Sequence, residues 1–223
     1  MFRILQVIGS TYMIIERLEV GVFAENCYIV GCEQTKAGFV IDPGDEVPEI
    51  LKKIDALGLD IKSVLITHAH IDHVKELYRF KQIINVPILM HKDDQFLLDS
   101  LKMQAAAFGL SVSGVPQVNQ YVTDGQLIEL GKYKFEILHT PGHSPGSVSF
   151  KSDEVVFVGD VLFSGSIGRT DLPGGNFEIL INSIKSKLLP LGNEMIVYPG
   201  HGPSTTIGQE KNFNPFLTGM LNN

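Results

Sequence analysis

Short runs of β-branched and aromatic residues alternate with amphipathic segments along this chain. Three early runs, at 13–20, 26–31 and 38–42, are separated by glycine or charged turns and predict hairpin strands. Residues 46–57 place their apolar side chains on one face of a 3.6-residue period, and a glycine follows them. That segment is therefore predicted to be a helix.

The middle of the chain continues this mixture. Residues 63–67 form a nearly unbroken apolar run, which is typical of a strand covered on both faces. A helix, a strand and a second helix then follow, at 74–84, 87–91 and 93–108. Asp93 or Asp94 is available to cap the second helix. Residues 111–125 show no clear period and predict a loop.

The second half of the chain repeats the order of the first. Four strands are predicted, at 126–130, 134–140, 146–152 and 155–159. A glycine-rich loop at 164–175, a helix at 177–188 and an apolar strand at 195–198 follow. Both halves contain a strand that ends in Asp beside Gly and a strand that leads to His. We therefore predict an α/β fold of two sheets packed face to face with helices outside.

Composition limits the partners of the protein. A length of 223 residues with 44% hydrophobic content predicts one domain over residues 1–223. The net charge of −7 argues against nucleic acid or an anionic membrane and favours a small-molecule substrate. Residues 1–10 lack the pattern of a secretion signal, and no uncharged apolar run reaches the roughly 18 residues of a membrane span. A cytoplasmic location is expected; the oligomeric state stays open.

Two cysteines, Cys27 and Cys32, lie five positions apart in one predicted strand. Side chains alternate between the two faces of a strand, so these thiols should point in opposite directions and cannot easily form a disulfide. We expect both to be reduced and packed.

Histidines gather in three short motifs. The segment 67–73 reads THAHIDH and places three imidazoles and one carboxylate at the end of a predicted strand. The segments 140–146, TPGHSPG, and 198–203, YPGHGP, each add one histidine flanked by glycine. Five of the seven histidines therefore fall in such motifs, which chance rarely produces.

Imidazole and carboxylate groups suit zinc and related divalent ions, and a catalytic ion needs several protein ligands with one position left for water. The motifs and one further aspartate supply enough ligands for two ions. Flanking glycines let the backbone turn sharply, so that ligands from distant segments can converge. The candidate ligands are His68, His70, Asp72, His73, His143, Asp160 and His201.

The motifs THAHIDH, TPGHSPGS, VVFVGDVLFSGSIGRTDLPGG and YPGHGP together resemble those of the metallo-β-lactamase-fold hydrolases. Within that superfamily, GSIGRTDLPGG and the ending PGHGPSTTIGQEKNFNPFL are most similar to the short glyoxalase II-like group. The resemblance implies a four-layer αββα sandwich with the metal site at the edge where the two sheets meet.

The resemblance also implies roles for the ligands. His68, His70 and His143 would hold the first ion, and the second ion would be held by three further residues, Asp72, His73 and His201. Asp160 would bridge the two ions, for which zinc is expected, with iron or manganese as alternatives. Two such cations can lower the pKa of a shared water to near neutrality, and the resulting hydroxide would attack the substrate. One ion would stabilise the oxyanion, and Asp72 would orient the hydroxide.

The implied substrate is a thioester, an S-2-hydroxyacylglutathione such as S-lactoylglutathione. Full-length glyoxalase II enzymes have a C-terminal helical extension that contributes thiol-binding contacts, whereas 22 residues follow His201 in this sequence. The acyl group and the thiol carrier therefore stay open. Two alternatives remain. The first is a persulfide dioxygenase with one iron held by His68, His143 and Asp160. The second is a metal-binding domain without turnover.

Several further residues have two interpretations each. His91 and His139 lie outside the motifs, and we expect structural roles for them, with support of a metal ligand as the alternative. Asp42, in an Asp-Pro-Gly sequence, could orient a ligand histidine or form a turn. Arg169 and Asp171 could bind a substrate carboxylate, although pairing with each other is favoured.

Overall fold

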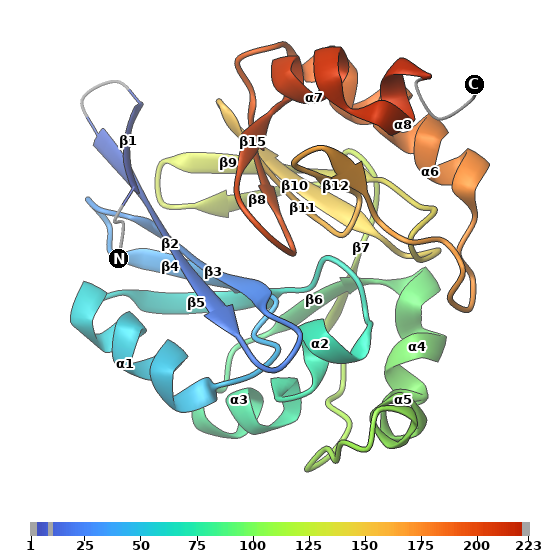
Figure 1. Cartoon of the computed structure of the whole chain (residues 1–223). Coiled ribbons are helices and arrows are strands. Elements are labelled where there is room, and N and C mark those ends of the chain that lie inside the picture. The colour runs from blue at the N-terminus through green and yellow to red at the C-terminus, as the bar shows by residue number, and fades with distance from the viewer. Residues whose placement is uncertain (1–3, 9–10, 220–223) are drawn as a thin grey trace.

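The computed structural model describes residues 4–8 and 11–219, whose strands form two large sheets that face each other (Figure 1). Residues 1–3 and 9–10, from the N-terminal segment examined for a secretion signal, lie outside the described residues, as do 220–223. The first sheet follows chain order, with strands β1 (Ile4–Ile8), β2 (Thr11–Val20), β3 (Glu25–Cys32), β4 (Ala37–Ile41), β5 (Asp60–Leu65), β6 (Ile88–His91) and β7 (Gln120–Val122).

The second sheet has the order β15-β14-β11-β10-β9-β8. Its strands are β8 (Leu127–Leu130), β9 (Tyr133–His139), β10 (Val148–Ser152), β11 (Val155–Gly159), β14 (Ile196–Pro199) and β15 (Thr205–Thr206). A small hairpin of β12 (Leu162–Phe163) and β13 (Ser166–Ile167) stands beside it.

Parallel strand pairing determines where the residues of the motifs lie. β4, β5, β6 and β7 run parallel in the first sheet, and β11 and β14 run parallel in the second. The carboxyl ends of parallel strands meet at one edge of a sheet. The residues that follow β4, β5 and β6 therefore lie together, and so do those that follow β11 and β14.

Helices cover the outer face of each sheet (Figure 1). The first sheet carries α1 (Val47–Leu57), α2 (Ile71–Val74), α3 (Leu77–Ile83), the 3-10 turn η1 (Lys92–Asp94), α4 (Gln95–Asp99) and α5 (Leu101–Ala107). The second sheet carries α6 (Phe177–Ser183), the π-helical turn η2 (Ile184–Leu188), the 3-10 turn η3 (Leu189–Leu191), α7 (Ile207–Phe213) and α8 (Pro215–Thr218).

Three hydrophobic cores fill the spaces between these layers. β3 shows why, because Cys27 and Ile29 pack under the helices of the first sheet while Tyr28, Val30 and Cys32 pack between the sheets. The core between the sheets also buries large aromatic side chains, each of which contributes about 1.5–3 kcal/mol when fully buried. The αββα sandwich is confirmed. Both cysteines are free and buried, as expected from their opposite faces.

Hydrogen bonds join the two sheets at the edge where the motifs lie. The backbone N–H of Val148 in β10 donates to the carbonyl of Thr67, just beyond β5, at 2.9 Å. The hydroxyl of Tyr28 in β3 donates to the carbonyl of Pro199 at 2.7 Å. The backbone N–H of Asn26 also donates to Gly200 at 2.7 Å. These bonds hold the ends of strands from both sheets against each other.

Two predicted helices are interrupted. The helix predicted at 74–84 corresponds to α3, with only Val74 in α2, because the N–H of Glu76 donates to the carbonyl of Gly44 at 3.0 Å rather than within a helix. The helix predicted at 93–108 is divided between α4 and α5 at Ser100, whose hydroxyl donates to Leu97 at 2.8 Å. Asp94 precedes α4 without a side-chain cap bond, so its predicted capping role is wrong.

Some short strands lie outside the predicted elements. β7 lies inside the predicted loop 111–125, where its pairing with β6 and the burial of Val122 stabilise a segment of weak local preference. The hairpin β12–β13 begins just before the predicted glycine-rich loop and continues into it, and β1 pairs with β2. Among the described residues, no helix has the length and apolar character to span a membrane. The assignment of residues 1–223 to one domain stays a prediction.

Candidate metal centre

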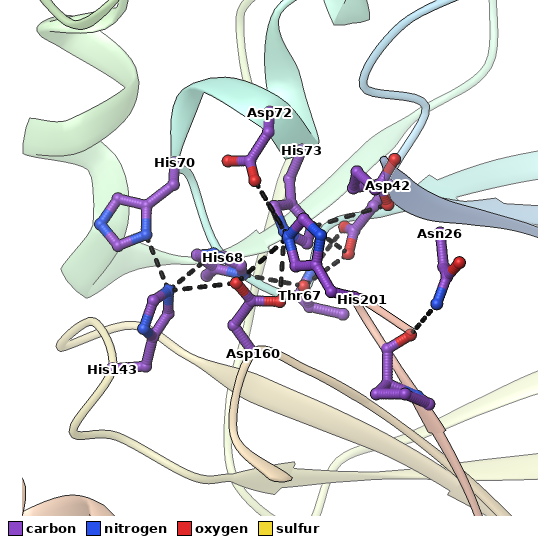
Figure 2. A network of polar contacts seen from close by, with 12 residues as sticks. Asn26, Asp42, Thr67, His68, His70, Asp72, His73, His143, Asp160 and His201 are labelled. Carbon is purple, nitrogen blue, oxygen red and sulfur yellow. Dashed lines mark hydrogen bonds and ion pairs between the residues drawn. The ribbon is translucent and has the colours of Figure 1, made fainter. Parts of the chain in front are cut away.

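Four segments bring their polar side chains to one point between the sheets (Figure 2). The loop after β5 and the short helix α2 supply the first motif, and the β9–β10 loop supplies His143. Asp160 follows β11, and His201 follows β14. The structure thus gathers all seven predicted ligands around one site.

Three histidines form one group, here called the three-histidine group: His68, His70 and His143. The Nε2 atom of His143 lies 3.1 Å from Nε2 of His68 and 2.8 Å from Nδ1 of His70. All three side chains are buried. His70 therefore presents its Nδ1 atom to the group, whereas its two partners present Nε2.

Two carboxylates and two imidazoles form a second group, here called the mixed group: Asp72, His73, Asp160 and His201. Nε2 of His201 lies 3.1 Å from Asp72 Oδ2 and 3.5 Å from Asp160 Oδ2. Nε2 of His73 lies 3.4 Å from Asp160 Oδ1. Asp160 Oδ2 also lies 3.6 Å from Nε2 of His143, so this carboxylate stands between the two groups.

Hydrogen bonds outside the three-histidine group decide which ring nitrogens carry protons. Nδ1 of His143 donates to the carbonyl of Arg169 at 2.7 Å. The Thr67 hydroxyl donates to Asp42 and can therefore accept from Nδ1 of His68 at 3.1 Å. In both histidines the Nε2 atom is left with a lone pair that points into the site.

Asp42 combines both of its predicted roles. Its carbonyl accepts from the N–H of Gly44 at 2.9 Å and so forms the turn. Its carboxylate accepts from Nδ1 of His73 at 2.9 Å and from the backbone and hydroxyl of Thr67 at 2.8 and 2.5 Å. The backbone of Asp42 adopts the uncommon left-handed conformation, with φ of 50°. The Asp42 carboxylate thus holds the His73 ring with its Nε2 atom facing the mixed group.

The donor set fits divalent cations. The lone pairs of His68 Nε2 and His143 Nε2 face each other at 3.1 Å, an arrangement that is repulsive unless a cation lies near both. His73 Nε2 and Asp160 Oδ1 are buried 3.4 Å apart, and neither atom makes a hydrogen bond among the described residues. Buried polar atoms are costly without a partner. Imidazole nitrogen with carboxylate oxygen is a ligand set for zinc, iron or manganese.

Electrostatics act differently on the two groups of candidate ligands. Burial, reinforced by neighbouring imidazoles, holds the pKa of His68 well below its ordinary value and lowers the pKa of His70 to about 3. Burial also acts against the charged form of His73, but the carboxylates around it outweigh that effect and raise its pKa. For Asp160, the adjacent imidazoles outweigh burial and lower its pKa. Near pH 7 the three-histidine group therefore contains neutral rings at His68 and His70, which can bind metal.

Two of the predicted glycine roles are confirmed. Gly142, before His143, has φ of 129°, and a Cβ atom there would lie 2.2 Å from the backbone nitrogen of Leu180. Gly159, before Asp160, has φ of 52°. Side chains are strained at both positions, so the sharp turns that aim these two ligands require glycine.

His91, Asp93 and His139 form a third close cluster. The two rings stack at 4.2 Å with an angle of 13° between their planes. A ligated ion lies in the plane of each ring, so rings this nearly parallel do not direct lone pairs at one ion. Nε2 of His139 donates to the carbonyl of Pro145 at 2.9 Å. The geometry favours the structural role predicted for both histidines, with His139 supporting the loop that carries His143.

Arg169 and Asp171 form an exposed pair. The guanidinium donates from Nε and from Nη2 to the two carboxylate oxygens, both at 2.7 Å. This is the mutual pairing that the sequence favoured. The backbone carbonyl of Arg169 has a separate role, because it accepts from His143.

Sequence reasoning missed Glu25 at the start of β3. Its carboxyl group is fully buried, and neither oxygen has a hydrogen-bond partner among the described residues. Oε1 lies 3.8 Å from Nδ1 of His73, and burial raises the pKa of Glu25 well above its ordinary value. A glutamate before an apolar strand reads as a surface residue, so the sequence carries no signal for this position.

We expect Asp42→Asn to weaken metal binding at the mixed group without unfolding the protein. The amide keeps the shape of the carboxylate but has only one oxygen. It therefore cannot accept from His73 and the Thr67 hydroxyl at one atom and also from the Thr67 backbone N–H at the other. Loss of a residue that orients a metal ligand typically costs about 10–100-fold in metal affinity or activity. Metal content after dialysis and hydrolysis rate are the measurements, with the exposed Asp60→Asn as control. Wild-type metal affinity in Asp42→Asn would contradict this role.

Comparison with known proteins places this geometry in a family. Residues 20–201 match the model of the metallo-beta-lactamase superfamily. The chain is 44% identical over 214 residues to the hydroxyacylglutathione hydrolase GloC of Haemophilus influenzae, with 92% of this chain and 98% of that protein aligned.

Two solved structures extend the comparison. BLEG-1, described as a B3 metallo-beta-lactamase, is 36% identical with a TM-score of 0.85, covering 92% of this chain and 99% of that chain. TTHA1623 in a di-iron-bound form is 40% identical with a TM-score of 0.83, covering 91% and 100%. The fold implies a dinuclear metal site, for which the two groups described above are the candidate ligands. The chain therefore belongs to the metallo-beta-lactamase superfamily.

Proposed function

We propose that this chain is a metal-dependent thioesterase that hydrolyses an S-2-hydroxyacylglutathione such as S-lactoylglutathione. The observation that carries the proposal is the convergence of seven imidazole and carboxylate side chains on one site, where His73 Nε2 and Asp160 Oδ1 are buried without a hydrogen bond among the described residues. The similarity to GloC extends over nearly all of both proteins and supports the thioester as the substrate class. A cytoplasmic location stays a prediction.

Each ligand has a proposed place. The three-histidine group would hold one ion, while Asp72, His73 and His201 would hold a second, with Asp160 shared between them. The proposed metal is zinc, with iron and manganese as alternatives; the relative TTHA1623 binds two irons. When bound, the ions would supply a hydroxide nucleophile near neutral pH and polarise the thioester carbonyl.

The protein side chains prepare that chemistry. His68 and His70 stay neutral because they are buried. The hydrogen bond from His143 to the carbonyl of Arg169 fixes the His143 proton on Nδ1. Asp72 is partly exposed and has a carboxylate oxygen 3.1 Å from His201 Nε2, where it would accept a hydrogen bond from the attacking nucleophile and orient it. No serine or cysteine nucleophile is needed for this reaction.

The proposal predicts metal-dependent hydrolysis in a substrate panel. The panel should contain S-lactoylglutathione, thioesters of other acyl groups and thiols, and a cephalosporin, assayed with quantified metal. We expect a thioester to be the preferred substrate. Preference for the cephalosporin, a β-lactam of the kind that the name of BLEG-1 suggests for that protein, would contradict the proposal. Full metal content without turnover of any member would favour a metal-binding domain.

A persulfide dioxygenase with one iron is the second candidate. The observation in its favour is that His143 lies within 3.1 Å of His68 and 3.6 Å of Asp160, which forms a compact set of two imidazoles and one carboxylate. Metal analysis with an oxygen electrode separates the two functions. One iron per chain and oxygen consumption on glutathione persulfide would replace the hydrolase proposal.

A further inference from the structure

Asp94 joins the two backbone segments that carry the three-histidine group. It follows β6, and its side chain is fully buried. Oδ2 accepts from the backbone N–H of Ala69 at 2.9 Å and from the hydroxyl of Ser144 at 2.8 Å. Oδ1 accepts from the backbone N–H of Gly146 at 2.6 Å. All three donors lie outside the helix that Asp94 precedes.

The positions of these donors explain what the carboxylate connects. Ala69 lies between His68 and His70, whereas Ser144 directly follows His143. One segment extends from the first sheet and the other from the second sheet. Asp94 therefore links the halves of the three-histidine group, and no described bond of its side chain reaches the mixed group.

The β9–β10 loop is shaped to let Asp94 approach. A Cβ atom on Gly146 would lie 2.6 Å from the backbone nitrogen of Asp94 and 2.7 Å from its Oδ1 atom, so only glycine fits. Ser147 completes the arrangement, because its hydroxyl accepts from the N–H of Ser144 at 3.1 Å and lies 2.8 Å from the Ser144 hydroxyl. Gly146 and Ser144 thus contact the Asp94 carboxylate directly, and Ser147 supports Ser144.

The charge state of the residue at 94 matters as much as its shape. A carboxylate can accept at both oxygens, whereas an asparagine must turn an N–H₂ group toward either Gly146 or Ala69. Both of those partners are backbone N–H donors, so one contact becomes a donor facing a donor. A buried donor without an acceptor costs about 1–3 kcal/mol, which the loop can relieve by moving away.

We propose that Asp94 is a positioning residue that fixes the spacing between His143 and the pair His68 and His70, and thereby sets the metal affinity of the three-histidine group separately from that of the mixed group. This inference rests on the proposed metal binding but not on the identity of the substrate. Asp94 touches neither substrate nor metal in this account; it acts through the backbone of its neighbours.

The test is a metal titration of the metal-free Asp94→Asn variant. We expect wild-type protein to bind two ions per chain, and Asp94→Asn to lose about 10–100-fold in affinity at one of them. Asp93→Asn is the matched control, because its carboxylate is half exposed and makes no bond to either histidine segment. Circular dichroism checks that all variants remain folded.

Spectroscopy of cobalt-substituted protein identifies which ion is weakened. At one cobalt per chain, Asp94→Asn should show the spectrum of His70→Ala, which lacks a ligand of the three-histidine group. It should differ from Asp72→Ala, which lacks a ligand of the mixed group. An equal loss of affinity for both ions, a loss of affinity at the mixed group alone, or unchanged affinity for both ions would each overturn the proposal.

A milder variant covers the case in which Asp94→Asn does not fold. Ser144→Ala removes one of the three bonds, and it should weaken the same ion by a smaller factor. Unchanged affinity of that ion in Ser144→Ala would then overturn the proposal. If wild-type protein binds two ions but does not hydrolyse thioesters, the proposed function fails while the role of Asp94 stands. Wild-type protein that binds no ion contradicts both.

Discussion

Asp160→Ala is expected to lower the rate of thioester hydrolysis by more than about 100-fold. This exceeds the usual effect of losing a residue that only orients a metal ligand. Asp160 is the carboxylate that lies within 3.6 Å of donor atoms in both groups. Its loss removes an anionic ligand from each proposed ion and leaves imidazole lone pairs without a shared partner. We expect at least one ion per chain to be released.

The fold should survive this substitution, because the Asp160 side chain faces the site rather than a hydrophobic core. Circular dichroism and metal analysis measure fold and metal content beside the rate. Asp55→Ala, an exposed position on α1, controls for the loss of a carboxylate elsewhere. Retained activity with two ions per chain in Asp160→Ala would refute the bridging role.

Removal of metal is expected to abolish hydrolysis and to lower the thermal midpoint Tm. An ion present at 1,000 times its Kd stabilises the folded state by about 4 kcal/mol. For a chain of 150–250 residues, that corresponds to a fall in Tm of roughly 10 °C when the ion is removed. The direction follows from the geometry, since chelation leaves buried donor atoms of the site without partners.

Differential scanning calorimetry and a rate assay before and after dialysis against a chelator make this measurement. Adding zinc back should restore both Tm and rate, while magnesium should restore neither, because it prefers an octahedral shell of oxygen ligands. Full activity at less than about 0.1 ion per chain would contradict the metal-dependent mechanism.

Much of the site could be predicted because its ligands are dense in the sequence. The motif of residues 67–73 carries four of the seven ligands, and the glycines beside His143 and Asp160 reveal the sharp turns that follow their strands. Strand ends are also predictable from apolar runs. The resemblance then supplied the sandwich and the pairing of ligands, which spacing alone does not determine.

The remaining features depend on contacts between distant segments. Asp94 reads as a helix cap, but its partners are Ala69 and the β9–β10 loop, which only the packing of the two sheets brings near. The break between α2 and α3 arises from a bond between Glu76 and Gly44. Neither contact leaves a periodic signal in the local sequence, so pattern reasoning misses both.

The central claim is that four distant segments surround two cations at the edge where the sheets meet. Anomalous diffraction from zinc-loaded crystals tests it most directly. The account predicts two peaks, one among the three-histidine group and one among the mixed group, with Asp160 adjacent to both. A single peak, or a peak beside the stacked rings of His91 and His139, would contradict it.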